Sequence, residues 1–192
     1  MAVITITAPA VEPVTVAEFK SHARIEYADE DAGIEKKITA AREYAERYLG
    51  FPFISTEFEL VLDTFPRGPL KLPAGRLQSV TSVKYVAPDT GLEVTLTAGT
   101  DYEVDTYSVP GWIAPAASGW PTPKATINAV RVRYVAGYGA TAADVPAAIR
   151  EAILQIASSY FENRESVSDV SMMSVPHGAE STLDNFRSYD WE

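Results

Sequence analysis

The chain has 192 residues, a length typical of one domain or of one domain that carries an inserted lobe. Its 46% hydrophobic, 22% charged and 10% aromatic residues exclude disorder of the whole chain. Lys and Arg number 16 against 26 Asp and Glu, giving a formal charge of −10 that repels phosphate backbones unless a basic patch is segregated; the sequence shows no such patch. The absence of Cys excludes disulfides and thiolate catalysis.

The N-terminus lacks the basic and apolar regions of a signal peptide, and no later segment approaches the ~18 apolar residues that span a bilayer. We therefore expect no membrane association, and we expect the protein to stay in the compartment where it is made.

Residues 1–54 are predicted to form the N-terminal helices of a helical core. After an extended start, Thr15 and Glu18 have the spacing of a capping box, in which hydroxyl and carboxylate each accept from the other residue's amide. This pattern predicts a short helix that ends at about Arg24.

Apolar residues recur every three or four positions from Asp31 to Leu49, the spacing of one buried helical face. We expect Asp29 or Asp31 to cap this helix at its start. Gly50 can take the left-handed conformation that ends it, and the following Pro prevents its continuation.

Residues 55–135 are predicted to form a β-lobe, because the hydrophobic period changes there to two. The turn residues Pro88–Gly91 predict a hairpin between the runs on either side. The segment from Pro110 to Lys124 is rich in Pro, and we expect an irregular connection that carries Trp112 and Trp120. The expected strands lie near residues 57–62, 80–86, 92–96, 102–105 and 129–134.

Helical periodicity returns in residues 136–165, where Asp144 is a candidate cap and Pro146 suits a first helical turn. Residues 166–192 are predicted to be a flexible Ser-rich linker followed by a partner-binding arm, with a possible helix start at Ser181. This arm carries the apolar side chains of Leu183, Phe186, Tyr189 and Trp191.

Helices at both ends with strands between them predict an α+β fold. In it, a small core of three main helices receives an antiparallel β-lobe between the second and third helices, and an extended C-terminal arm follows.

The sequence offers no catalytic constellation. It has no G-x-S-x-G elbow, and its only imidazoles, His22 and His177, lie in the first predicted helix and in the predicted linker. The segment Gly137–Gly139 lacks the spacing that cradles phosphates and is interpreted as a bend between strand and helix. We therefore predict no catalytic residues, no cofactor and no metal site.

Two features of the β-lobe leave a ligand-binding alternative open. Asp101, Glu103 and Asp105 can share one strand face and gather Ca²⁺, although alternating solvent-facing acids explain them as well. Trp112 and Trp120 can stack on sugar rings, or they can pack over the lobe itself.

The apolar C-terminal segment also has two interpretations. A flexible spacer that ends in aromatic anchors is how a chain docks into a groove on a neighbour. Alternatively, the segment folds back on the chain's own helices.

Taken together, the motifs resemble the tailed-phage head–tail connector (adaptor) family. The resemblance rests on PVTVAEFKSHARI at Pro13–Ile25, the helix IEKKITAAREYAERYLG at Ile34–Gly50, LPAGRLQSVTSVKYV at Leu72–Val86, and the stretch from Val132 to Glu165. The most telling patterns are AxRxYxE with Arg42, Tyr44 and Glu46, VPxxIxxAI from Val145 to Ile153, and YxENR from Tyr160 to Arg164.

The resemblance implies a structural virion protein without enzymatic activity. It implies a homo-oligomeric ring, a dodecamer in the particle, that joins the portal to the stopper or tail and continues the DNA exit channel. DNA would pass through without specific binding, in keeping with the acidic composition. The location would be the virion neck, assembled in the bacterial cytoplasm, in a phage, a prophage remnant or a gene transfer agent.

By the same analogy, the C-terminal arm with Leu183, Phe186, Tyr189 and Trp191 would bind the portal, and the loop with Trp112 and Trp120 would face a ligand or the tail. The alternative is a carbohydrate- or calcium-binding β-module with helical flanks.

Overall fold

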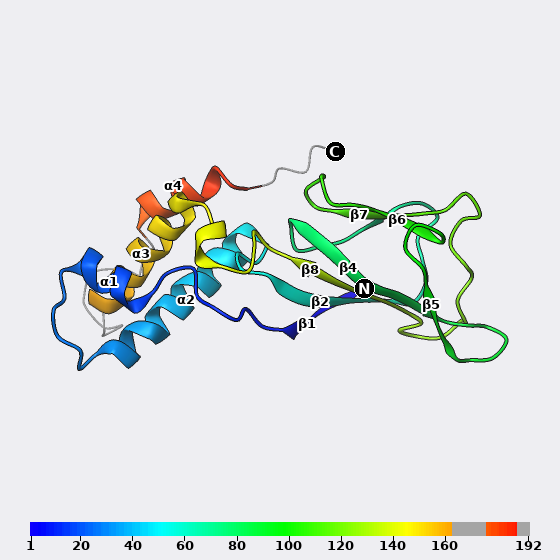
Figure 1. The fold of residues 1–192 in the computed structure, drawn as a ribbon, viewed down its shortest axis with the longest axis horizontal. Helices are drawn as coiled ribbons and strands as arrows, with labels where there is room; N and C mark the ends of the chain where they lie inside the picture. The colour runs from blue at the N-terminus through cyan, green and yellow to red at the C-terminus, as the bar shows by residue number, and fades with distance from the viewer. Residues whose placement is uncertain (163–175, 188–192) are drawn as a thin grey trace. The chain divides into compact units, whose positions relative to one another are not determined.

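The computed structural model describes residues 1–162 and 176–187. The chain divides into a β unit, residues Met1–Pro9 and Ser55–Tyr138, and a helical unit, residues Ala10–Ile54 and Gly139–Glu192 (Figure 1). Helices and antiparallel sheets confirm the predicted α+β class, with the main strand-forming segment inserted between the second and third α-helices.

A five-stranded antiparallel sheet forms the larger part of the β unit, in the order β1-β2-β8-β4-β5. The predicted hairpin is confirmed, because β4 and β5 pair across the turn, with Val86 opposite Glu93. The bounds are β1 (Ala2–Thr7), β2 (Thr56–Leu62), β4 (Leu77–Val86), β5 (Glu93–Leu96) and β8 (Val130–Ala136).

The central strand β8 shows why this sheet has one buried and one exposed face. Side chains alternate across a strand, so Val132 and Tyr134 are fully buried while Arg131 and Arg133 lie on the open face. There Arg133 Nε donates to Glu59 Oε1 across the pair with β2, at 2.8 Å. Val and Ile suit the half-buried pleated surface of such a sheet.

A second sheet of three short strands has the order β3-β7-β6, with β3 at Leu70–Lys71, β6 at Tyr102–Asp105 and β7 at Trp112–Pro115. The inner faces of both sheets share one hydrophobic core, which includes Leu60, Leu70, Val83, Tyr102, Ile113 and Val132.

The expectation of an irregular connection throughout residues 110–124 is wrong at β7. Pro115 fits there because Ala116, the next residue, donates its N–H to Asp101, which leaves the Pro115 nitrogen facing away from β6. On that side β3 reaches only as far as Ile113, so no ladder hydrogen bond is lost.

The N-terminal residues also differ from the expectation that 1–54 belong to the helical core. Residues 2–7 form the edge strand β1, paired with β2, and residues 1–9 belong to the β unit. The alternation of Val, Ile and Thr favours this strand, but its partner lies about 50 positions further along the chain.

The helical unit begins with α1 (Val16–Ala23), and its capping box is confirmed. Thr15 Oγ1 accepts from the Glu18 amide at 3.2 Å, and the Glu18 carboxylate accepts from the Thr15 amide at 2.8 Å. The left-handed residue Arg24, at φ 55°, ends the helix.

The long helix α2 (Asp31–Leu49) has its predicted bounds and ends at Gly50, whose φ of 81° suits only glycine well. The predicted cap by Asp29 or Asp31 is wrong, because the N-cap residue is Glu30, without a side-chain capping bond. Asp31 is already helical and accepts from Lys20 Nζ at 2.9 Å.

The third long helix, α3 (Ala147–Glu162), begins after Pro146. Asp144 does not cap it, because its carboxylate closes a capping box with Thr141 in a preceding 3₁₀ turn, Ala142–Asp144. The apolar faces of α1, α2 and α3 form the core of this unit, which includes Phe19, Ile34, Ile38, Ile149, Ile153 and Ile156.

A fourth helix, α4 (His177–Asp184), ends near the residue where the sequence suggested a helix start. The predicted flexible linker and arm of 166–192 is therefore wrong for this part, which is helical within the helical unit. Residues 163–175 and 188–192 lie outside the described part of the chain.

Gly111→Ala should destabilise the β unit. A Cβ at residue 111 would lie 2.3 Å from Leu77 Cβ, which its backbone holds in place. We expect a loss of about 1–3 kcal/mol in the free energy of unfolding, measured by chemical denaturation. Gly68→Ala, where nothing lies within 4 Å of the new Cβ, is the matched control; equal losses in the two variants would contradict the assignment.

Glu18 should make the stability of the helical unit pH-dependent. The Thr15 amide, the Thr15 hydroxyl and Arg150 hold the pKa of Glu18 below its usual value, against an opposing effect of burial. The stabilisation is therefore complete above the unfolded pKa of about 4.3 and lost as the pH falls through the lower folded value.

Thermal unfolding between pH 7 and pH 3 tests this expectation. The melting temperature of Glu18→Gln should lie below that of the wild type at pH 7, and the difference should narrow as the pH falls to 3. Glu26→Gln, at an exposed position, is the control. A gap for Glu18→Gln that stays constant over this range would refute the expectation.

Candidate partner-binding surfaces

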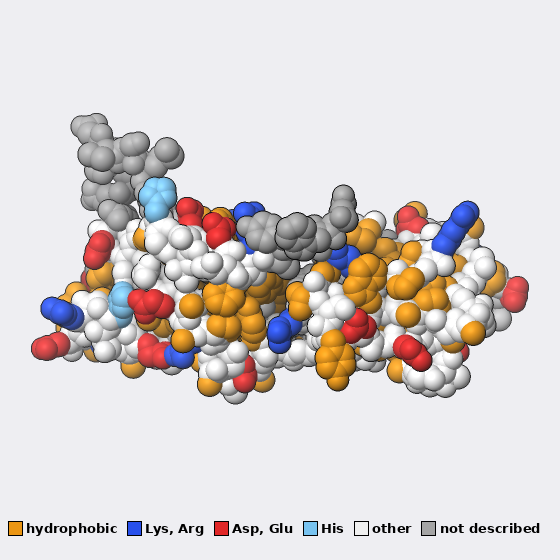
Figure 2. Space-filling view, turned by 90° about the horizontal axis from the view of Figure 1, so that it is seen from above, with side chains coloured by type: hydrophobic (Ala, Val, Ile, Leu, Met, Phe, Trp, Pro, Cys, Tyr) orange, Lys and Arg blue, Asp and Glu red, His pale blue; other side chains and the backbone are white. Residues whose placement is uncertain are grey.

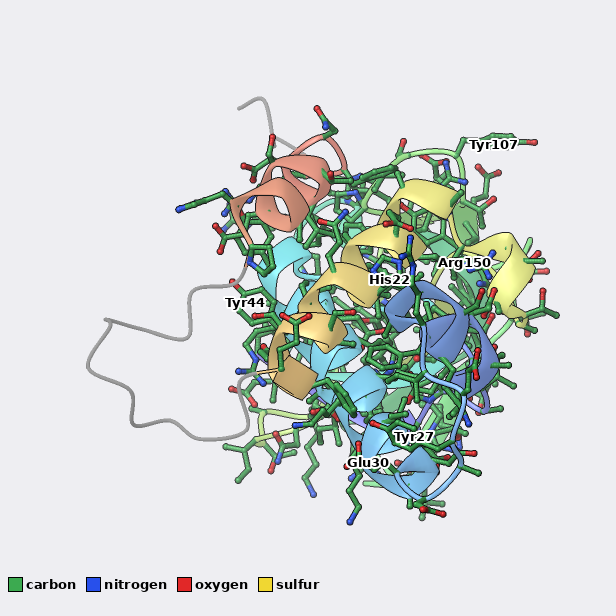
Figure 3. All side chains as sticks on the ribbon, turned by 90° about the vertical axis from the view of Figure 1, so that its left-hand side faces the viewer. His22, Tyr27, Glu30, Tyr44, Tyr107 and Arg150 are labelled. Atoms are coloured by element: carbon green, nitrogen blue, oxygen red, sulfur yellow. The ribbon has the colours of Figure 1, made fainter. Side chains whose placement is uncertain are left out.

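The helix α4 is attached to α2 by two matched pairs of side chains. Tyr44 and Tyr48, one turn apart on α2, donate their hydroxyls to Glu180 at 2.9 Å and Asp184 at 2.7 Å, one turn apart on α4. Arg187 lies over the Tyr48 ring, 5.2 Å from its centroid. We call these five residues the tyrosine clamp; Tyr44 is labelled in Figure 3.

The electrostatics of the clamp require protonated phenols. Burial and the hydrogen bond to Glu180 raise the pKa of Tyr44 to about 12. For a group with a raised pKa, the stabilisation is complete below the unfolded value of about 10 and lost as the pH rises through the folded value. The clamp therefore stays intact at neutral pH.

The predicted portal-binding residues divide into three groups. Leu183 is fully buried within the helical unit. At this residue the chain folds back on its own helices, which was the alternative to a partner-binding arm. Phe186 follows α4 and is half-buried. Tyr189 and Trp191 lie outside the described residues.

The AxRxYxE pattern supplies a buried ionic cluster. The Arg42 side chain is 8% exposed; its Nε donates to Glu12 Oε2 at 2.8 Å and its Nη1 to Glu46 Oε2 at 2.5 Å. Thr39 donates to the other oxygen of Glu12, and the amide of Phe53 to the other oxygen of Glu46. Every carboxylate oxygen of this pair thus has a partner, which a buried ion pair needs in order to persist.

The pKa values in this cluster reflect a balance between burial and pairing. Burial alone would lower the pKa of Arg42, but the hydrogen bond to Glu12 and the charge of Glu46 raise it. Burial raises the pKa of Glu46 more than the Phe53 amide and Arg42 lower it. Arg42 is therefore permanently charged, and the cluster has the character of a structural anchor.

The two candidate tryptophans have different surroundings. Trp120 stacks on Phe65, with ring centroids 4.6 Å apart, and its Nε1 donates to the Gly68 carbonyl at 2.9 Å. This is the packing alternative, because the ring face and the indole N–H already have partners. Trp112 lies on β7, half-buried, with Lys71 Nζ 5.9 Å from its ring centroid.

Trp112 belongs to the face of the small sheet that points away from the shared core. Hydrophobic side chains gather over β6 and β7 in the right-hand part of the view in Figure 2. This face offers the half-buried ring of Trp112 to a partner.

Of the three acidic residues in and beside β6, Asp101 and Asp105 are engaged in turns, and Glu103 lies within the strand, exposed. Asp105 accepts from the amides of Tyr107 and Ser108 and from the Ser108 hydroxyl, and Asp101 accepts from the Thr97 amide at 2.7 Å. Among residues 1–162 and 176–187, no group of three or more His, Cys, Asp or Glu side chains is placed to hold a metal ion. The geometry thus gives no support to the calcium-binding alternative.

The histidines lie at separate positions on the helical unit. His22 is on α1, with Nδ1 3.9 Å from Glu151 (Figure 3). His177 is the first residue of α4, not part of a linker, and its side chain is 96% exposed. Neither forms a hydrogen bond with a Ser or Thr hydroxyl in the described part of the chain.

The Gly137–Gly139 segment is a bend between β8 and the 3₁₀ turn, as its sequence indicates. Gly137 has φ 135°, and a Cβ at Gly139 would lie 2.3 Å from the Asp144 carboxyl carbon. Both glycines therefore have a structural role, because they allow the backbone to bend at this point.

Charge is distributed unequally between the two units. Residues 10–54 and 139–192 hold 18 Asp and Glu against 9 Lys and Arg, a formal charge of −9 out of the chain's −10. Acidic side chains are frequent on the helical unit in Figure 2. No helix in the described segments has the length and apolarity needed to cross a membrane.

Sequence reasoning missed the tyrosine clamp. The signal was present as two i, i+4 pairs, Tyr44 with Tyr48 and Glu180 with Asp184, on segments 136 positions apart. Only the structure shows that these pairs face each other.

Replacing both Tyr44 and Tyr48 by Phe should loosen α4. The variant loses two hydrogen bonds to carboxylates, so we expect the docking of α4 to weaken. Hydrogen exchange should then accelerate at residues 177–184 and stay unchanged in α3. Tyr27→Phe, at an exposed loop position, is the control, and unchanged protection of α4 in the double variant would contradict the role of the clamp.

The fold is similar to solved structures of gene transfer agent (GTA) particles. One is the neck of an empty GTA particle computed with C6 symmetry, and another is the virion of a native GTA particle; each has a TM-score of 0.82. A third, the neck of a native GTA particle computed with C12 symmetry, has a TM-score of 0.74. Each alignment has 23% identity and covers 98% of this chain and 96% of the other.

No curated protein sequence matches the chain. A family model for head completion proteins, however, matches residues 12–177, which include all of the helical unit's α1, α2 and α3 and nearly all of the β unit. With that match over most of its length and a fold shared over almost all of it, the chain belongs to the head completion protein family.

Proposed function

We propose that the protein is a structural component of the neck of a tailed particle, where a ring of copies joins the portal to the stopper or tail. The observation that carries this proposal is the family match over residues 12–177. The similarity to structures of GTA necks supports it at the level of the fold. We infer a dodecamer in the particle, assembled in the bacterial cytoplasm.

The role is mechanical rather than catalytic. The tyrosine clamp and the Arg42 cluster use their polar groups to hold the chain's own segments together. A structural ring needs such internal anchors, and the acidic helical unit, with a formal charge of −9, disfavours retention of DNA by its phosphates. DNA would accordingly pass through the ring without specific binding.

The C-terminal end is the proposed portal contact. Leu183 is buried and holds α4 in place, so the contact begins with the half-buried Phe186 and continues with Tyr189 and Trp191. Aromatic anchors of this kind supply most of the binding energy at many interfaces. The exposed face of β7 with Trp112 is the proposed contact toward the stopper or tail; Trp120 packs against the core of the β unit instead.

Mixing the protein with its cognate portal tests the proposal. We expect sedimentation to show a complex and negative-stain microscopy to show a ring with an open centre on the portal. The double variant Tyr189→Ser with Trp191→Ser should lose portal binding, whereas Trp112→Ala should retain it.

The protein alone and the portal alone are the controls. A wild-type chain that is folded and yet fails to bind the portal under any assembly condition would overturn the proposed function. Retention of binding by the Tyr189 and Trp191 double variant would overturn only the C-terminal contact.

A further inference from the structure

The five-stranded sheet has two open edges. β1 lies at one end of the strand order and β5 at the other, and within the described residues no further strand pairs with either. All six residues of β1 are exposed; among them Val3 is 41%, Ile4 50% and Ile6 40% exposed. On β5, Val94 is 38% exposed. Apolar side chains therefore reach both edges of the sheet: Val3 and Val94 lie on the core side and Ile4 lies on the outer side.

The β1 edge has only one of the features that keep edge strands from pairing, a local irregularity near its end. Natural edges are protected by charged side chains, Pro, very short strands or bulges. The sequence AVITIT of Ala2–Thr7 has no charge and no Pro, and its only irregularity is a register shift between Thr5 and Thr7. A six-residue strand of this composition offers its backbone N–H and C=O groups to another strand.

The two edges match in direction and in phase. Because every neighbouring pair in this five-stranded sheet is antiparallel, β1 and β5 run in the same direction. One row across the sheet lies on the same side at every position: Val3, Leu60, Val132, Val83 and Leu96. The three inner members of this row are buried, Leu96 is half-buried and Val3 is exposed. A sheet that continues from β1 of one copy to β5 of the next therefore keeps one apolar face.

We propose that β1 of each copy pairs in parallel with β5 of the neighbouring copy, so that the β units join head to tail. The occupant of the β1 edge is thus a second copy of this chain. This inference rests on the proposed ring, because a head-to-tail contact between two different edges can close into a ring, whereas pairing of β1 with β1 is two-fold and ends at a dimer.

Engineered cysteines test the pairing, because the chain has no Cys of its own. Ile4 and Thr95 lie on the same, outer face of the sheet, and both are exposed. The full chain with Ile4→Cys and Thr95→Cys, assembled on the portal and then oxidised, should give a ladder of covalent oligomers. Ile4→Cys with Glu93→Cys tests the register two residues away.

The matched control differs only in the face of the sheet on which one of the two thiols lies. Thr5→Cys with Thr95→Cys places one thiol on the inner face and one on the outer face, because neighbouring residues of a strand point to opposite sides. This pair should give no ladder although Thr5 is also exposed.

A charge at the edge gives a second, independent measurement. Ile4→Lys should keep the melting temperature and portal binding of single copies but abolish rings, because the Lys blocks the edge as in natural protected strands. Ile127→Lys, the same change at a loop residue that is 78% exposed, should leave ring formation intact.

The outcomes separate the pairing from the proposed function. If Ile4→Lys still forms rings and neither cysteine pair gives a ladder, the proposed pairing is wrong, whereas the proposed neck function is unaffected. Covalent dimers from Ile4→Cys alone would show β1–β1 pairing, and a bond from Ile4→Cys to a cysteine placed in the portal would show a different occupant; both overturn it. Absence of wild-type rings on the portal would overturn the ring and the pairing together.

Discussion

The buried guanidinium of Arg42 is the contact on which the path of the chain depends. The chain passes between its two units after Pro9, Ile54 and Tyr138. Glu12 lies just beyond the first of these points and bonds Arg42 directly, while Phe53, just before the second, is bonded through Glu46. Removing the guanidinium would leave two carboxylates without their main partner, which typically costs several kcal/mol.

The residues next to the third of these points contact the residues next to the second. Ile54 forms a parallel bridge with Gly139, and the Asp144 carboxyl occupies the space that a side chain on Gly139 would need. The three segments of the helical unit that lie next to these points are thus held within that unit by backbone and ionic contacts. Within the AxRxYxE pattern, Arg42 and Glu46 thus bind segments of the helical unit that lie next to these points, and Tyr44 binds α4.

Local chemistry made much of the fold predictable, and pairing between distant segments accounts for the failures. The bounds of α2 and the hairpin of β4 and β5 follow from periodicity and turn residues within short windows. The strand β1 and the central strand β7 depend on partners far along the chain, and Pro115 is tolerated only because β3 is two residues long. The start of α4 was missed because its buried residues, Ala179 and Leu183, are too few to set a period.

The candidate binding residues could be chosen from the sequence by their aromatic or apolar type. Only the burial of each side chain in the structure distinguishes the residues that pack inside the protein from those that a partner can reach. Aromatic and apolar type alone could not distinguish Trp120, stacked on Phe65, from Trp112 on an open sheet face. Nor could it distinguish Leu183, which holds α4 in place, from Phe186 just beyond it. The resemblance to head–tail connectors was more informative, because it depended on several spaced motifs that the family match then covered.

Both units are discontinuous in sequence, and this has a consequence for synthesis of the protein. The sheet of the β unit needs β8, which ends at Ala136, to join β2 with β4, and the helical unit needs α3, which ends at Glu162. A ribosome must therefore release most of the chain before either core can close. Until then β2, which pairs with β1 on one side, lacks its second partner β8. Folding is therefore dominated by non-local contacts, which slow the folding of a chain and leave unpaired strands exposed for longer.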